Sequence, residues 1–181
     1  MKILHYSDHL DNNLVSYFGL CDVFLCTGDL SLFHFASIEK NIPLKDCFGV
    51  YGNHCNPGYL EQLGIQNVHL KILKWRNYSV SGFQGCLRYK ESGGPQFTED
   101  EANILLKDFP HVDILLLHAP PFGILDDPDD PVHSGSKSVR DYIDRTNPKY
   151  VFCGHLDPTA EVQYNNTTIF RTDGAKLFNL E

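Results

Sequence analysis

Four polar clusters, each placed directly after an apolar run, contain the side chains of this sequence that could do chemistry. They are Gly28-Asp29, Gly52-Asn53-His54, His118 and Gly154-His155. An apolar run of about four to six residues that stops at a polar, glycine-containing cluster is typical of a buried strand that ends in a loop. Open α/β sheets place their functional groups in the loops at the carboxyl ends of strands. Carboxylate, amide and imidazole groups gathered there would suit a divalent metal ion.

Length and composition favour one globular domain and exclude several classes of protein. The chain has 181 residues, of which 42% are hydrophobic and 12% aromatic, so it can bury a substantial core. We therefore expect a single domain over residues 1–181. The formal net charge of -8 disfavours nonspecific nucleic-acid binding, although bound metal ions could supply positive charge to a nuclease.

The absence of a signal peptide or membrane span, and the spacing of the cysteines, predict a soluble, cytoplasmic protein. The N-terminus lacks the long apolar segment of a signal peptide, and no stretch approaches the roughly 20 apolar residues of a membrane span. The six cysteines form no C-x-x-C pair and lie mostly in or beside apolar runs, so we expect reduced core thiols. The sequence leaves the oligomeric state open.

The order of the predicted elements indicates parallel strands first and antiparallel strands later. Strands are expected over 2–6, 23–26, a segment ending near 51, 68–74, 78–83, 112–117, 149–153, 160–164, 167–171 and 176–180. Helices are expected over 13–20, 31–40, 57–63, 98–108 and 136–145. Thr98 and Glu101 have the spacing of a capping box, and Asp11 or Asn12 could cap the first helix. Residues 82–96 are rich in glycine and predict a loop that could cover a site.

The order of these clusters resembles the pattern of the calcineurin-like metallophosphoesterases. That family has D-x-H, GD, GNH followed by an acid, H, and G-H-x-H, each at the end of a strand. The matching stretches here are Ser7-Asp8-His9-Leu10, Gly28-Asp29, Gly52-Asn53-His54-Cys55, His118 and Gly154-His155-Leu156-Asp157. The resemblance implies an α/β fold in which two mixed β-sheets form a sandwich flanked by helices.

The resemblance also implies a two-metal site. Asp29 would bridge both ions, and the second ion would take the ligands Asn53, His118 and His155. The first ion would use Asp8 and two positions at which this chain has Leu10 and Asp157 instead of the family's histidines. Leucine cannot bind a metal, whereas aspartate can. The implied cofactors are one or two divalent ions per chain, Mn²⁺ first, with Fe, Zn, Mg or Ni as alternatives.

The reaction that the resemblance implies is hydrolysis of a phosphodiester or a small phosphorylated molecule by a metal-activated hydroxide. His54 would act as the general acid for the leaving oxygen or stabilise the oxyanion. The family has an acid after this histidine, a natural partner for the imidazole. Cys55 stands at that position, so a partner for His54 must come from elsewhere or be absent.

Several residues also have simpler interpretations. Asp8 could merely cap the following helix, and Asp157-Pro158 is a common start of a turn. His133 could lie near a substrate phosphate or be a solvated loop histidine. Leu10 and Asp157 also motivate a rival hypothesis, in which the chain is a catalytically impaired member that serves as a protein-binding scaffold. A nuclease is a further alternative, which the acidic composition disfavours.

Overall fold

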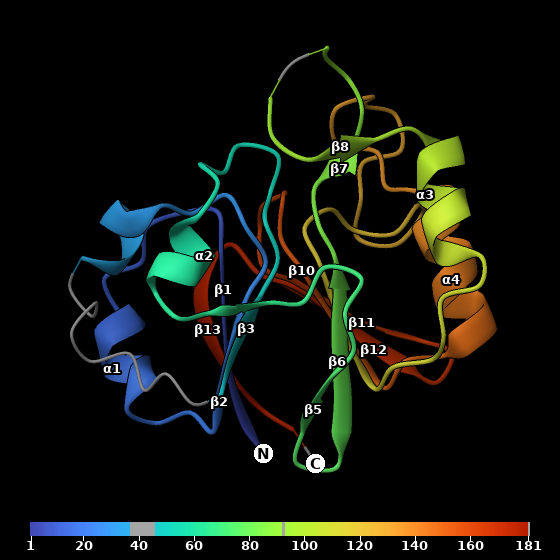
Figure 1. Ribbon diagram of the computed structural model, residues 1–181. Coiled ribbons are helices and arrows are strands. Elements are labelled where there is room, and N and C mark those ends of the chain that lie inside the picture. The colour runs from blue at the N-terminus through green and yellow to red at the C-terminus, as the bar shows by residue number, and fades with distance from the viewer. Residues whose placement is uncertain (37–45, 92, 181) are drawn as a thin grey trace.

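Two mixed β-sheets pack face to face in the computed structural model, which describes residues 1–36, 46–91 and 93–180 (Figure 1). The first sheet has the strand order β13-β1-β2-β3-β4. β1 to β4 run parallel to one another, and β13 pairs antiparallel with β1. These strands are β1 (Lys2–Ser7), β2 (Val23–Cys26), β3 (Cys47–Gly49), β4 (Gln66–Asn67) and β13 (Gly174–Asn179).

The second sheet has six strands in the order β11-β12-β10-β9-β6-β5. β6, β9, β10 and β12 run parallel, whereas the edge strands β5 and β11 are antiparallel to their neighbours. The strands are β5 (Leu73–Trp75), β6 (Tyr78–Phe83), β9 (Ile114–Leu117), β10 (Tyr150–Cys153), β11 (Ala160–Tyr164) and β12 (Thr167–Arg171). The predicted sandwich of two mixed sheets is thus confirmed.

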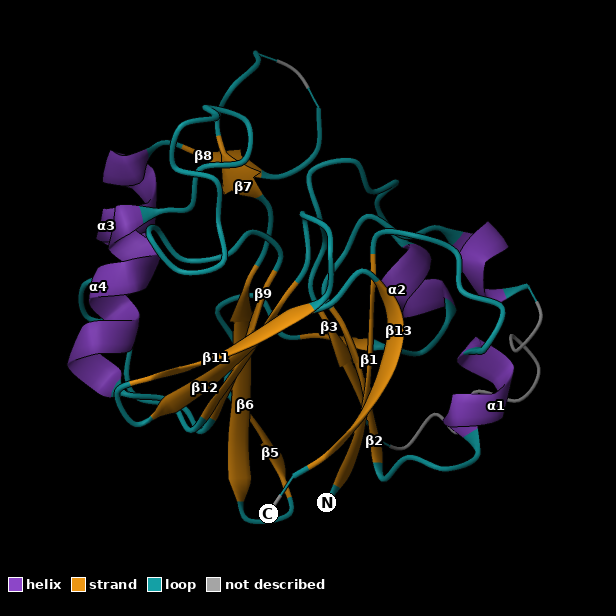
Figure 2. Ribbon diagram, turned by 180° about the vertical axis from the view of Figure 1, so that it is seen from behind, coloured by secondary structure: helices purple, strands orange, loops and turns teal. Residues whose placement is uncertain are grey.

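Alternation of side chains along the strands builds three buried layers. Leu25 and Val50 of the first sheet and its loops meet Leu116 and Phe152 of the second sheet in the central layer. The outer face of the first sheet packs against α1 (Leu14–Phe18) and α2 (Tyr59–Gln62). The outer face of the second sheet packs against α3 (Glu99–Leu106) and α4 (Lys137–Thr146), and Figure 2 shows the helices on these two flanks.

The starts of the helices agree with the sequence in one case and differ in another. Thr98 and Glu101 form the predicted capping box at the start of α3. The N-cap of α1 is Asn13, without a side-chain cap. Asp11 instead accepts the N–H groups of Asn13 at 2.8 Å and of Ala175 at 3.0 Å. Its carboxylate therefore ties the loop after β1 to the start of β13.

Three other predicted segments differ in extent from the structure. Of the helix expected over 31–40, the structure shows the 3-10 turn η1 (Leu32–Phe35), and residues 37–45 lie outside the described part. Of the strand expected over 68–74, the structure has β5 from Leu73 onward. The loop expected over 82–96 contains the tail of β6 and a short parallel pair, β7 (Cys86–Leu87) and β8 (Gln96–Phe97).

The carboxyl ends of the parallel strands in both sheets point toward one edge of the sandwich, the upper edge in Figure 1. The loops that follow β1, β2, β3, β9 and β10 therefore meet at that edge. The pair β7-β8 and its connecting loop stand above the same edge (Figure 1). This convergence brings residues from distant parts of the sequence into one site.

Two sequence expectations concern the whole chain. All six cysteines are free, and five of them are buried, as expected for reduced core thiols. Among the helices that the structure describes, none combines the length and the apolar character needed to cross a membrane.

Candidate metal centre

Three side chains that follow different strands converge at the loop edge. Asp29 follows β2, His118 follows β9 and His155 follows β10, and one potential ligand atom from each lies within 4.8 Å of the others. Nε2 of His118 lies 3.3 Å from Oδ2 of Asp29 and 3.1 Å from Nδ1 of His155. Oδ1 of Asn53, from the loop after β3, lies 2.8 Å from the same Nε2. Four predicted residues thus surround one point.

The outer nitrogen of each imidazole is held by a backbone carbonyl. Nδ1 of His118 donates to the carbonyl of Thr27 at 2.7 Å, and Nε2 of His155 donates to the carbonyl of Val132 at 3.0 Å. In a neutral ring, one nitrogen carries the proton and the other keeps a lone pair. When both rings are neutral, as a bound metal requires, these two bonds leave the lone pairs of His118 Nε2 and His155 Nδ1 facing the cluster. A bond of this kind from the outer nitrogen to a carbonyl orients histidine ligands in metalloproteins.

The charges within the cluster are coupled. Burial opposes ionisation of Asp29, but the neighbouring His118 and the N–H of His54 hold the pKa of Asp29 at about 2. Burial opposes protonation of His118, yet the hydrogen bond and charge of Asp29 leave its pKa above the ordinary value. Burial and the nearby His118 charge lower the pKa of His155 to about 4. Asp29 is thus ionised and His155 neutral, which are the metal-ligand forms of these groups, whereas His118 beside Asp29 favours its protonated form and would release that proton when a cation binds.

Unusual backbone geometry brings the cluster together. Asp8, Asp29 and His155 have φ angles of 62°, 52° and 71°, in the left-handed region that non-glycine residues rarely adopt. Such conformations cost about 1–3 kcal/mol each and persist where the surrounding structure enforces them. A Cβ on Gly154 would lie 1.9 Å from Oγ of Ser7 and 2.3 Å from Oδ2 of Asp8. Glycine at position 154 therefore lets the loops after β10 and β1 touch.

His54 lies at the solvent-facing side of the cluster. Its backbone N–H donates to Oδ1 of Asp29 at 2.7 Å, and its side chain is exposed. The hydroxyl of Tyr89 accepts a hydrogen bond from Nδ2 of Asn53 at 3.1 Å and lies 3.3 Å from Nε2 of His54. Tyr89 was not among the residues proposed from the sequence. The available signal was its position in the glycine-rich loop that was expected to cover a site.

Cys55 does not act as an orienting partner for the His54 imidazole. Its sulfur accepts the N–H groups of Asp29 and Gly52, both at 3.0 Å. The thiol therefore joins the loops after β2 and β3. Burial raises the pKa of Cys55, so the group is a neutral thiol rather than a thiolate.

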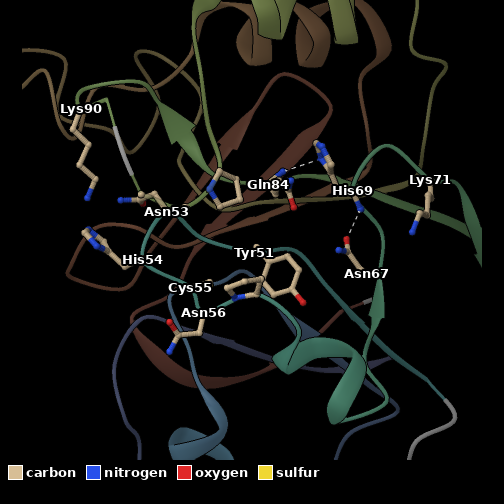
Figure 3. Close-up of a pocket in the computed structure, with 14 residues that line it drawn as sticks. Tyr51, Asn53, His54, Cys55, Asn56, Asn67, His69, Lys71, Gln84 and Lys90 are labelled. Carbon is tan, nitrogen blue, oxygen red and sulfur yellow. Dashed lines mark hydrogen bonds between the residues drawn. The ribbon is translucent and has the colours of Figure 1, made fainter.

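A cleft of about 810 Å³ extends from Asn53 and His54 away from the cluster. It is open to solvent, and Figure 3 shows the side chains that line it. Volumes of about 300–1,000 Å³ are typical of sites for small molecules. The lining residues are Tyr51, Asn53, His54, Cys55, Asn56, Pro57, Asn67, His69, Lys71, Gln84, Lys90, Gly93, Gly94 and Pro95.

Comparison with known families identifies this arrangement. The family model described as calcineurin-like phosphoesterase matches residues 1–156, which include the whole cluster. The chain belongs to the calcineurin-like phosphoesterases. Members of this family are hydrolases that act on phosphoester bonds, so this protein is a metallophosphoesterase by family, and the family uses divalent metals.

Individual relatives of this calcineurin-like phosphoesterase are distant. An uncharacterized protein of Methanocaldococcus jannaschii is 28% identical over 199 aligned positions, which cover 98% of this chain and 90% of the relative. The crystal structure of TT1561 of Thermus thermophilus aligns with a TM-score of 0.63 at 18% identity, covering 94% of this chain and 88% of that one. Phosphopantetheinyl hydrolase of Mycobacterium tuberculosis aligns with a TM-score of 0.64 at 14% identity, covering 96% and 89%. At these identities the solved structures show the shared fold.

The residues predicted for the first metal of this phosphoesterase lie less close together. Oδ2 of Asp8 accepts the N–H of His155 at 2.9 Å, and burial raises the pKa of Asp8. Asp157 is exposed, and its carboxylate is not part of the group formed by Asp29 and the two histidines. Leu10 is 52% exposed. The structure therefore assembles the predicted second site more fully than the first.

His133 packs against His155, a member of the cluster. Its ring centroid is 5.3 Å from that of His155, and its Nδ1 bonds Oδ2 of Asp130 at 2.6 Å. Asp126 and Asp130 accept backbone N–H groups of their own loop, from Gly135 and Val132. These acids stabilise the loop that carries the Val132 carbonyl, which holds His155.

Proposed function

We propose that this protein hydrolyses a phosphodiester or a small phosphorylated molecule with a divalent cation held by Asp29, Asn53, His118 and His155. The proposal rests on one observation above all. Three potential ligand atoms, from Asp29, Asn53 and His155, surround Nε2 of His118, and bonds to backbone carbonyls turn the inner nitrogens of both imidazoles toward that point. Ionised carboxylate, amide oxygen and imidazole together suit Mn²⁺, and equally Fe, Zn, Ni or Mg.

The bound cation would lower the pKa of a water molecule and neutralise charge on the phosphate oxygens. In the hydrolysis, a bond forms between a water-derived oxygen and phosphorus, and the bond from phosphorus to the leaving oxygen breaks. His54 lies beside Asp29 and Asn53 with an exposed imidazole, so it can give its proton to that leaving oxygen. Tyr89 contacts the Nε2 atom of His54 and limits the orientation of the ring.

Asp8 and Asp157 are our candidates for ligands of the other ion, the first of the two that the family resemblance implies. Asp8 touches the backbone of His155, whereas Asp157 lies in the exposed turn that follows. Because Leu10 cannot bind a metal, we expect this ion to bind more weakly than the ion held by Asn53, His118 and His155.

The remaining properties of the chain are also proposals. We propose that residues 1–181 fold as one domain, and that the protein works in the cytoplasm, where its six free thiols would stay reduced. We favour a small-molecule substrate over nucleic acid because the formal net charge is -8.

The decisive experiment combines metal content with activity. After loading with Mn²⁺, we expect at least one tightly bound ion per chain and turnover of bis(para-nitrophenyl) phosphate. His54→Ala should lower turnover of hexyl phosphate, whose leaving oxygen must be protonated, by about a hundredfold or more while metal content stays unchanged. His111→Ala is the matched control, because that exposed histidine bonds the carbonyl of Thr146 before the starts of β9 and β10, at the opposite ends of these strands from the cluster.

A different result would favour the scaffold hypothesis. Metal binding should raise the melting temperature, because a ligand that binds only the folded state stabilises it by mass action. A chain that shows no shift with Mn²⁺ and no turnover of phosphomonoesters or phosphodiesters would instead be a catalytically impaired member of the family. Turnover of single-stranded DNA or RNA without turnover of small phosphoesters would favour the nuclease alternative.

A further inference from the structure

The cleft beside His54 is basic although the protein is acidic. The chain has 23 acidic and 15 basic residues, yet the described residues that line the cleft include two lysines and no aspartate or glutamate. Figure 3 shows the lysines at opposite ends. Lys90 lies on the side of Asn53 and His54, whereas Lys71 lies on the far side. The cleft therefore offers a cation at each end to an elongated anionic ligand.

Two further side chains at the far end are set as hydrogen-bond donors. Oδ1 of Asn67 accepts the backbone N–H of His69 at 3.0 Å, which leaves the amide hydrogens on Nδ2 for another partner. Nδ1 of His69 accepts the N–H of Gln84 at 3.3 Å, which places the proton of the neutral ring on Nε2. Figure 3 shows both bonds beside Lys71.

The ring of His69 is neutral and its remaining N–H is free. Burial, and then the charge of Lys71, lower the pKa of His69 to about 4, so the ring is uncharged at neutral pH. Phe83 and Phe97 pack against it with centroid distances of 5.5 and 5.8 Å. In the part of the chain that the structure describes, Nε2 of His69 has no protein hydrogen-bond partner. This nitrogen is accessible to solvent.

Lys71 completes this group. Its ammonium group offers three N–H donors, and Figure 3 shows it on the same side of the cleft as His69 and Asn67. Within the described residues, no carboxylate forms an ion pair with it. The far end thus contains three donors, from Lys71, His69 and Asn67. Backbone N–H groups already bond the acceptor atoms of His69 and Asn67. A site that presents only hydrogen-bond donors, one of them cationic, suits an oxyanion.

We infer that Asn67, His69 and Lys71 bind a second phosphate group of the substrate, at the end of the cleft opposite His54. The inference rests on the proposed function, because His54 defines the direction in which the leaving portion extends. The residue that protonates the leaving oxygen lies where the metal cluster meets the cleft. The substrate class is therefore a phosphoester whose leaving portion carries a second phosphate.

Matched substrates test this inference. We would measure kcat/KM of the Mn²⁺-loaded protein for propanediol, hexanediol and decanediol bisphosphates and for propyl, hexyl and decyl phosphates. At the chain length that spans the cleft, kcat/KM for the bisphosphate should be about tenfold higher than kcat/KM for the matching monophosphate. This is the gain expected from one charge-assisted contact. Lys71→Ala should abolish this advantage.

Lys74→Ala is the matched control, because Lys74 is an exposed lysine on β5 and does not line the cleft. It should keep the advantage of the bisphosphate. If hexyl phosphate is hydrolysed but the bisphosphates show no advantage at any length, or keep one in Lys71→Ala, the inference is wrong while the proposed function stands.

Calorimetric titration covers the case in which no alkyl phosphate is turned over. Hexanediol bisphosphate should bind the wild-type protein about tenfold more tightly than Lys71→Ala, and Lys74→Ala should match the wild type. Equal affinities of wild type and Lys71→Ala would overturn the second-phosphate site. Preferential binding without any turnover would support the site and count against the proposed catalytic function.

Discussion

The hydroxyl of Tyr89 lies 3.3 Å from Nε2 of His54 and at the same time accepts a hydrogen bond from Nδ2 of Asn53 at 3.1 Å. It therefore links a candidate metal ligand to the candidate general acid. The family pattern has an acid after the histidine, and this chain has Cys55, whose sulfur is occupied by backbone N–H groups. Tyr89, far along the sequence, supplies a contact to the imidazole that the neighbouring position cannot make.

Replacing Tyr89 should slow the hydrolysis of substrates whose leaving oxygen must be protonated, if His54 is the general acid. In Tyr89→Phe, we expect kcat for alkyl phosphates to fall by up to about tenfold, the value of one lost hydrogen bond. Turnover of para-nitrophenyl phosphate should change by less than about threefold, because its leaving oxygen needs little protonation. Tyr17→Phe is the control, since Tyr17 packs beside the outer core of the first sheet. An equal loss for both substrates would contradict this role.

Removing His155 should impair metal binding without unfolding the protein. Its side chain is only partly buried, so His155→Ala removes a ligand and leaves the fully buried His118 in place. We expect Mn²⁺ affinity to fall by at least about tenfold, read by calorimetry and by the loss of the Mn²⁺-dependent rise in melting temperature. His9→Ala serves as the control, because His9 is 76% exposed and bonds Asp173 outside the group of ligands. Unchanged affinity in His155→Ala would remove this residue from the metal site.

Position 154 should tolerate nothing larger than glycine. Gly154→Ala forces a Cβ against Ser7 and Asp8, at distances that real structures do not show. The loops after β1 and β10 must then separate, which should cost about 1–3 kcal/mol of unfolding free energy and weaken Mn²⁺ binding. Gly19→Ala is the matched control, because a Cβ there meets nothing within 4 Å and its φ is -73°. That variant should be neutral or slightly stabilised in urea unfolding.

The buried His5 should make stability depend on pH. Its two ring nitrogens bond the hydroxyls of Thr172 and Thr27, each at 2.8 Å, and burial lowers its pKa from 6.5 to about 3. Below pH 6.5, His5 binds a proton in the unfolded chain but stays neutral in the folded protein. Stability is therefore fully present above pH 6.5 and is lost as the pH falls toward 3, by up to about 1.4 kcal/mol per pH unit.

Urea unfolding between pH 7 and pH 4 measures this effect. In His5→Gln the group that titrates is gone, so the difference in unfolding free energy between wild type and variant should shrink as the pH falls. Because other groups titrate in both proteins, the difference isolates His5. A difference that is constant across this range would show that His5 does not carry the pH dependence.

Local sequence predicted most of the elements and proposed the candidate ligands. Apolar runs that stop at polar clusters predicted β2, β9 and β10, because buried strands need apolar side chains on both faces. The capping box at Thr98 and Glu101 was likewise predictable, since both partners lie within one helical turn. The irregular segment over 82–96 was predicted as a loop, but its short strand pair depends on a partner that no local pattern reveals.

The tertiary structure alone decided which side chains act together. Residue types proposed Asp29, Asn53, His118 and His155, whereas the contacts around Nε2 of His118 arise because strands from both sheets end at one edge. Tyr89 beside His54, and Gln84 beside His69, are pairings of residues 35 and 15 positions apart in the sequence that meet in space. Long-range contacts of this kind depend on how the two sheets pack, and a one-dimensional pattern of residues does not specify that packing.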